Sequence, residues 1–207
     1  MITEPATTIT DYLMAALAIG FATSLARAGA ACEHARWWSR AFAVLAVSAL
    51  AGGTYHGFRD ALTPWGGEAL WRITVATSSL ASFALMRAIT DQWLGAGRRT
   101  AWSRVAIAKL VVALAAGVVH PVFTVVVVDF GISMLFAVGA AAVARAQDRR
   151  AFRFLAAGVA LFGCGAVIQQ AGLSPHPAFN HNDLFHVIQV LGNVCFLLSA
   201  RFPCPRH

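Results

Sequence analysis

The sequence predicts an all-α membrane protein, a bundle of seven transmembrane helices with its N-terminus outside and its C-terminus inside. Hydrophobic residues make up 58% of the 207 residues and charged residues only 12%, whereas a soluble domain is about half apolar and roughly a quarter charged. The apolar residues form runs long enough to cross a bilayer, and the basic residues gather in alternate connections between these runs. This composition excludes a soluble globular domain, a disordered chain and a collagen-like fibre.

Seven apolar stretches use nearly the whole chain, so we expect a single transmembrane domain over residues 1–207. A helix needs about 20 apolar residues to cross ~30 Å of hydrocarbon. The stretches are long Ala, Leu, Val and Gly runs, and a membrane β-barrel would instead show short segments of alternating polarity. The expected helices are residues 11–28, 38–58, 67–89, 101–119, 121–144, 151–171 and 182–200.

The boundaries of these helices differ in clarity. The first helix follows the segment MITEPATTIT, which carries no Lys or Arg, so we expect no cleavable signal peptide. Between the fourth and fifth helices only Gly117–Pro121 interrupts the apolar run, and six spans with one re-entrant piece is the alternative. Pro121 suits the first turn of a new helix, which favours seven helices.

The cysteines form no CxxC pair, and Cys164 and Cys195 fall inside helices, so we expect no disulfide framework.

The basic residues predict the orientation. With the N-terminus outside, all but Arg59 and Arg72 of the 16 Lys and Arg residues fall on the inner side. The net charge of +7 therefore reflects a positive-inside bias, in which basic residues determine the orientation of the helices in the membrane. We expect no nucleic-acid partner. The residues assigned to the inner side are Arg27, Arg36, Arg40, Arg87, Arg98, Arg99, Arg104, Lys109, Arg145, Arg149, Arg150, Arg153, Arg201 and Arg206.

Histidines and acids gather at the opposite, outer side. Only His34 and His207 fall inside. Glu68, at the start of the third helix, and Asp60, in the connection before it, join the outer group. Ionisable groups at membrane depth are costly and usually functional, so this side is where we expect a site. The outer histidines are His56, His120, His176, His181 and His186.

A polar stripe runs down the last helix. Asn182, His186, Gln189 and Asn193 are spaced by four, three and four residues, so they share one helix face. In lipid such a stripe must face protein or a cavity. Gln189 and Asn193 suit hydrogen bonds between helices, whereas His186 with Asn182, Asp183 or His181 offers ligand types that metals use. The second helix offers a matching face, on which Ser48, Gly52 and His56 repeat every four residues.

These residues resemble a superfamily of seven-helix membrane hydrolases that includes the alkaline ceramidases and the adiponectin/progestin receptors, often called CREST. The resemblance rests on His56 in TYHGF, Glu68 in GGEALW, and His186 and Gly192 in FHVIQVLGNVCFLLSA. It implies a zinc ion held by one histidine of the second helix and two of the seventh, with an acidic residue of the third helix nearby. The chain would then form a distant bacterial branch of that superfamily.

Two positions depart from the superfamily pattern. Four residues before His186 stands Asn182 where a histidine is expected, so His181, Asn182 or Asp183 would have to supply the third ligand. Four residues before His56 stands Gly52 where a serine is expected, and Ser48 lies one turn deeper. Of the three histidines that the superfamily pattern expects, two stand at the matching positions, His56 and His186.

The resemblance implies a zinc-dependent hydrolase of a lipid amide or ester, with metal-activated water as the nucleophile. A zinc ion with an open position makes hydroxide available at neutral pH, and a nearby carboxylate can carry the proton. Glu68 is the first choice for that carboxylate and Asp60 the second. We expect a membrane lipid as substrate or ligand, and a location in the bacterial inner membrane with the site near the periplasmic face.

Asp129 in VVVVDFG is a separate puzzle, because a charged Asp inside a transmembrane helix must be paired, protonated or exposed to a cavity. We expect Ser133, Gln169 or Gln170 as its partner. A proton-coupled transporter that uses Asp129, Glu68 and the histidines as a relay is one alternative function. A haem protein with axial histidines and a non-catalytic sensor that resembles a receptor are two others.

Overall fold

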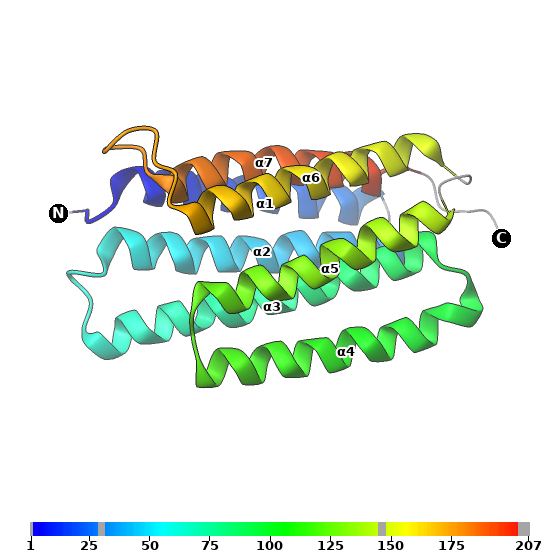
Figure 1. The fold of residues 1–207 in the computed structure, drawn as a ribbon, viewed down its shortest axis with the longest axis horizontal. Coiled ribbons are helices and arrows are strands. Elements are labelled where there is room, and N and C mark those ends of the chain that lie inside the picture. The colour runs from blue at the N-terminus through cyan, green and yellow to red at the C-terminus, as the bar shows by residue number, and fades with distance from the viewer. Residues whose placement is uncertain (1, 29–31, 145–147, 203–207) are drawn as a thin grey trace.

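The computed structural model describes residues 2–28, 32–144 and 148–202. These residues form seven α-helices, all of them long and apolar enough to cross a membrane, so the prediction of an all-α fold with seven such helices is confirmed (Figure 1). The helices are α1 (Pro5–Ala28), α2 (Glu33–Phe58), α3 (Pro64–Trp93), α4 (Ala96–Val119), α5 (Phe123–Ala144), α6 (Arg149–Ala171) and α7 (His181–Ala200).

Local sequence signals mark several helix ends. Thr63 caps α3 by accepting a hydrogen bond from the Gly66 N–H, and Pro64 occupies the first turn. Asp148 caps α6 in the same way, and the left-handed Gly172 (φ 64°) terminates that helix. The boundary between α4 and α5 is a short break after Val119, so these are two separate helices, not one span with a re-entrant piece.

The first helix starts earlier than expected. α1 begins at Pro5, whereas the hydrophobic run predicted a start at residue 11. Asp11 therefore lies six residues inside the helix, roughly 9 Å along its axis at about 1.5 Å per residue. This shift places an acidic side chain of α1 inside the bundle.

The helices are unequally packed. α1 packs on α2, α2 on α3, and α6 on α7, and these three contacts are the most extensive in the structure. α4 packs only against α3 and α5 within the described part of the chain, and Figure 1 shows it at the edge of the bundle. α1 begins at one end of the bundle, which we call the outer end. α7 ends at the opposite end, which we call the inner end.

The main hydrophobic core occupies the inner half of the bundle. Its members come from the C-terminal halves of α1, α3, α5 and α7 and the N-terminal halves of α2 and α6, with Trp38 and Leu155 fully buried. α6 and α7 approach closely at Gly158 and Gly192, because a Cβ on Gly158 would lie 2.5 Å from the Phe196 ring and one on Gly192 would lie 2.7 Å from the Phe162 ring. A cavity extends from the outer end to about the middle of the bundle, where the core residues Met134 and Phe162 line it.

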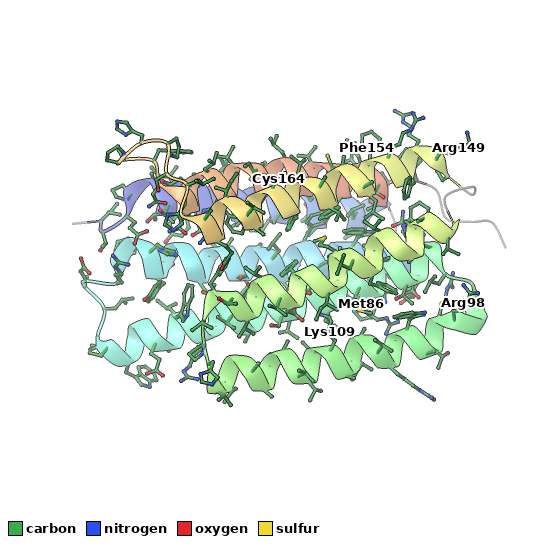
Figure 2. All side chains as sticks on the ribbon, viewed as in Figure 1. Met86, Arg98, Lys109, Arg149, Phe154 and Cys164 are labelled. Atoms are coloured by element: carbon green, nitrogen blue, oxygen red, sulfur yellow. The ribbon has the colours of Figure 1, made fainter. Side chains whose placement is uncertain are left out.

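Most of the basic residues assigned to the inner side lie at the inner end, with Lys109 an exception. Figure 2 shows Arg98 and Arg149 at the inner end and Lys109 about midway along α4. The Lys109 ammonium is nearly buried and donates to the Asp129 carboxylate of α5. Arg145, Arg206 and His207 lie outside the described residues.

One cysteine differs from the sequence-based expectation. Cys32, just before α2, is disulfide-bonded, although we expected no disulfide framework. Cys164 and Cys195 are free, and Cys204 lies outside the described residues.

Candidate functional site

A cavity of about 540 Å³ opens between six of the seven helices, all except α4. Its apolar wall comes mainly from α5 and α6, whose residues Phe130, Met134, Val159 and Phe162 line it at helical spacing. Its polar residues come mainly from α1, α2, α3 and α7, and those nearest the helix termini lie at the outer end. They are Asp11, Ser48, His56, Thr74, Ser78, Gln169, Asn182, His186 and Gln189.

His186 is held by two side chains of α1. Its Nδ1 lies 3.0 Å from the Thr10 Oγ1, and its Nε2 lies 3.3 Å from the Asp11 Oδ1. The His186 side chain is only 10% exposed and that of Asp11 only 5%. Both ring nitrogens thus have partners within the protein, and the imidazole forms one wall of the cavity.

His56 lines the same cavity from the last turn of α2. Its Nδ1 lies 3.2 Å from the Glu4 Oε2, and the other oxygen of Glu4 accepts from Arg59 at 2.9 Å. His56 is thereby tied to the chain segment before α1, much as His186 is tied to α1 itself. The two histidines predicted from different helices do converge on one end of one cavity.

The first turn of α7 serves mainly as a helix cap. The Asn180 side chain accepts from the backbone N–H groups of Asn182 and Asp183, and the Asp183 Oδ2 accepts from the Asn180 N–H at 2.7 Å. The other oxygen of Asp183, Oδ1, is buried and has no hydrogen-bond partner. Asp183 is also close enough to Asp11 and His56 for their charges to interact.

The remaining residues of the predicted stripe divide between the cavity and the helix contacts. Asn182 lines the cavity and accepts a hydrogen bond of 2.7 Å from the Gln169 Nε2 of α6. Gln189 also lines the cavity, whereas Asn193 is buried and does not line it. His181 lies outside the cavity lining, and its backbone N–H donates to the Ser174 Oγ.

Hydroxyl groups of α2 and α3 form a further polar patch in the cavity wall. The Ser48 Oγ lies 2.7 Å from the Ser78 Oγ and also donates to the Thr74 carbonyl at 3.1 Å. Gly52, one turn from Ser48, leaves room for Asp11, whose Oδ2 would lie 3.7 Å from a Cβ at that position. A Cβ at Gly52 would thus make only ordinary contacts, whereas one at Gly53 would lie 2.8 Å from the Asp11 Cβ, so Gly53 is the glycine that allows the close approach of α1 to α2.

The two predicted catalytic carboxylates do not line the cavity. The Glu68 Oε1 accepts from the Arg72 guanidinium at 2.9 and 2.7 Å, and its side chain is 59% exposed. Asp60 is 75% exposed, in the connection between α2 and α3. Both residues lie at the end of the bundle that their sequence positions predicted, but both are exposed and lie outside the cavity that His56 and His186 line.

Asp129 also lies away from the cavity. It faces α3 and α4, where the Lys109 Nζ donates to its carboxylate and, at 3.0 Å, to the Ser82 Oγ. Ser133, one of the expected partners, bonds instead to Ser82 at 2.9 Å, and Gln169 bonds to Asn182. The acceptor Asp129 Oδ2 remains buried without a hydrogen-bond partner.

A family model matches residues 6–204 of the sequence, which is nearly its full length. The chain belongs to DUF6962, a family of unknown function. Neither a search of curated proteins nor a search of solved structures gave a significant match.

The donor set of this DUF6962 chain does not fit a zinc ion as it stands. Over residues 2–28, 32–144 and 148–202, no group of three or more His, Cys, Asp or Glu side chains is placed to hold a metal. The Nδ1 of His186 is hydrogen-bonded to Thr10, and its Nε2 lies 3.3 Å from a carboxylate oxygen of Asp11. His181, a proposed third ligand, is outside the cavity lining.

The residues that the sequence analysis missed belong mostly to α1. Thr10 and Asp11 hold His186, and Glu4 holds His56, yet the expected helix began only at residue 11. One signal was available: with the N-terminus outside, the start of the first helix lies at the same membrane depth as His56 and His186. An acidic residue in the first turns of that helix was therefore a candidate member of the site.

Proposed function

We propose that this protein binds one amphipathic ligand inside its helix bundle, with the apolar part in the cavity and the polar part at Asp11, His56 and His186. The cavity carries the proposal, because about 540 Å³ is the size of a site for a small molecule. Apolar side chains dominate its lining, and a few polar groups converge at one end. That division matches a molecule with a hydrocarbon part and a single polar group, as in a membrane lipid.

The polar end is built to hold its geometry. Each histidine is oriented by a carboxylate, His186 by Asp11 and His56 by Glu4. These contacts join α1 to α2 and α7, so the groups that would meet the ligand are fixed by packed helices. Pre-organised polar groups bind a ligand at lower entropic cost than mobile ones.

The orientation proposed for the bundle puts this polar end near the periplasmic face of a bacterial inner membrane. The support is the charge distribution, since Arg98, Arg99, Arg149 and Arg150 begin helices at the inner end. Basic residues are concentrated in cytoplasmic connections. The N-terminus would then lie outside and the C-terminus inside.

A direct test measures whether the cavity holds a molecule. Gly163 lines the cavity, is exposed, and has no atom within 4 Å of an added Cβ, so Gly163→Phe should fold and obstruct the space. Gly139 of α5 is equally open but does not line the cavity, which makes Gly139→Phe the matched control. Each protein would be purified in lipid nanodiscs, extracted with organic solvent and analysed by mass spectrometry.

The expected result is a defined small molecule in stoichiometric amount with the wild type and with Gly139→Phe, and at least a tenfold loss with Gly163→Phe, equivalent to roughly 1.4 kcal/mol. Equal amounts in all three preparations would show that the molecule is bulk lipid and would contradict the proposal. Absence of saturable binding for any added amphipathic probe would contradict it as well.

A second candidate is the zinc-dependent lipid amide or ester hydrolase implied by the resemblance to the ceramidase superfamily. Its support is that His56 and His186 reach one cavity end, as that resemblance requires. Metal analysis of the purified protein tests it: the hydrolase requires stoichiometric zinc that is lost in a His56→Ala/His186→Ala double variant. Protein without bound zinc, or zinc retained by the double variant, would leave only the binding function.

A further inference from the structure

We propose that the polar group of the ligand is a protonated amine, so that the site takes an alkyl chain with a cationic head. This inference rests on the proposed binding function and names the chemical class that the cavity selects. It follows from three observations: no Lys or Arg side chain among the described residues lines the cavity, two buried acidic residues without a Lys or Arg partner lie near its outer end (Asp11 in the lining and Asp183 outside it), and two buried acceptors near that end have no hydrogen-bond partner.

No Lys or Arg side chain of the described residues lines the cavity, although the chain has 16 of them. An anionic head, such as a carboxylate or a phosphate, would enter a space where its charge has no cationic partner. Burying an unpaired charge costs several kcal/mol. The lining therefore disfavours fatty acids and phospholipid head groups.

Three acidic side chains, Glu4, Asp11 and Asp183, lie near the outer end of the cavity, and of these only Asp11 lines it. Glu4 is paired with the Arg59 guanidinium, but among the described residues no Lys or Arg side chain is bonded to Asp11 or Asp183. Their charges are close enough to interact with each other, and both residues are nearly inaccessible, at 4% and 1% exposure. Two buried carboxylates at close range call for a cation or a shared proton.

Acceptor atoms at this end outnumber donors. The Asp183 Oδ1 and the Gln169 Oε1 are buried without hydrogen-bond partners, and only one oxygen of Asp11 meets His186. An ammonium group supplies three donors and one positive charge. Charge-assisted bonds from an ammonium to a carboxylate are among the stronger hydrogen bonds in proteins.

A metal cation answers the charge excess less well than an amine. No cluster of three or more metal-binding side chains is formed within the described part of the chain. The cavity also continues from Asp11 along Met14, Met134 and Val159, which gives an attached alkyl chain an apolar path. A bare ion would leave that apolar space unused.

Three probes of one chain length test the inference: dodecylamine, dodecanol and dodecanoate. Their binding would be measured by displacement of a fluorescent amphiphile from the protein in phosphatidylcholine nanodiscs at neutral pH, with empty nanodiscs subtracted. We expect dodecylamine to bind at least tenfold more tightly than dodecanol, as one charge-assisted hydrogen bond allows, and dodecanoate to bind most weakly. Dodecanol binding as tight as dodecylamine binding, or tighter dodecanoate binding, would overturn the amine proposal while leaving a ligand site in place.

Variants separate the head-group contact from general loss of structure. Asp11→Asn should remove most of the preference for dodecylamine over dodecanol, and Asp60→Asn, which neutralises an exposed carboxylate outside the cavity, should keep it. If Asp11→Asn does not fold, Gln169→Leu, which removes a buried acceptor from the cavity lining, should reduce the same ratio at least threefold. A preference that survives both changes would contradict the proposal. Failure of all three probes to bind would instead contradict the binding function itself.

Discussion

The Lys109 ammonium of α4 donates to the Asp129 carboxylate of α5, and both residues lie within helices that are long and apolar enough to cross a membrane. The two side chains are 9% and 3% exposed, and Ser82 of α3 accepts a further hydrogen bond from Lys109. Because α4 packs only against α3 and α5 among the described residues, this pair lies where the edge helix meets the bundle. Breaking it should therefore loosen α4 specifically.

Removal of one member of the pair should destabilise the protein. Lys109→Met leaves a buried Asp129 carboxylate, and Asp129→Leu leaves a buried ammonium, so we expect each to lower the free energy of unfolding by about 3–5 kcal/mol. The Lys109→Met/Asp129→Leu double variant should recover most of the loss. Denaturant unfolding in detergent micelles measures all three. Additive losses in the double variant would show that the two side chains do not act as a pair.

The close approach of α6 and α7 should depend on two glycines. Gly192→Ala would place a Cβ 2.7 Å from the Phe162 ring, and Gly158→Ala would place one 2.5 Å from the Phe196 ring. Overpacking of this kind costs about 1–3 kcal/mol. Gly139→Ala, at an open position, should be neutral or slightly stabilising. Thermal unfolding followed by circular dichroism distinguishes them, and equal midpoints for Gly192→Ala and Gly139→Ala would argue against the tight contact.

One glutamine joins three helices near the inner end. Gln92 of α3 accepts from the Trp38 Nε1 of α2 at 2.8 Å and donates to the Ser199 carbonyl of α7 at 2.9 Å. Gln92→Leu leaves the Trp38 Nε1–H without its acceptor and removes one donor from the Ser199 carbonyl, which keeps a hydrogen bond from the Phe202 N–H, and we expect a loss of about 1–3 kcal/mol. Gln170→Leu, at an exposed site of α6, is the control and should change stability little. A neutral Gln92→Leu would mean that water replaces the lost amide.

The orientation is testable with reporter fusions in a bacterial host. Green fluorescent protein folds in the cytoplasm and alkaline phosphatase is active in the periplasm. Fusions after residue 94, before α4, and at the C-terminus should fluoresce, whereas a phosphatase fusion after residue 120, between α4 and α5, should be active. The reverse pattern would mean that the protein has the opposite orientation in the membrane, with the polar end of the cavity at the cytoplasmic face.

The helices were predictable because hydrophobic length alone determines a membrane span. The expected 151–171 and 182–200 differ from α6 and α7 by two residues or fewer at each end. The error at α1 arose because Thr7 and Thr8, which precede the expected start at residue 11, are polar, and hydropathy does not distinguish buried polar residues in a helix from a solvated connection. Their burial depends on contacts with α2 and α7.

The site was predictable only in part. Helical spacing identified His56, His186, Asn182 and Gln189, all of which line the cavity. The depth of a residue in the membrane does not tell which way its side chain points. Glu68 lies at the predicted end of α3, but its side chain pairs with Arg72 away from the cavity. A single sequence also gives no distance between helices, which is why the partner of Asp129 was not recognised on α4.

The uneven packing of the bundle has a consequence for ligand exchange. Core contacts concentrate in the inner half, where rings such as Trp38 and Phe196 lie 5.6 Å apart, whereas the outer half surrounds the cavity. Local stability follows the density of buried apolar contacts. Small openings of the helices should therefore cost least at the outer end, and the proposed ligand would enter and leave there while the packed inner half holds the helices together.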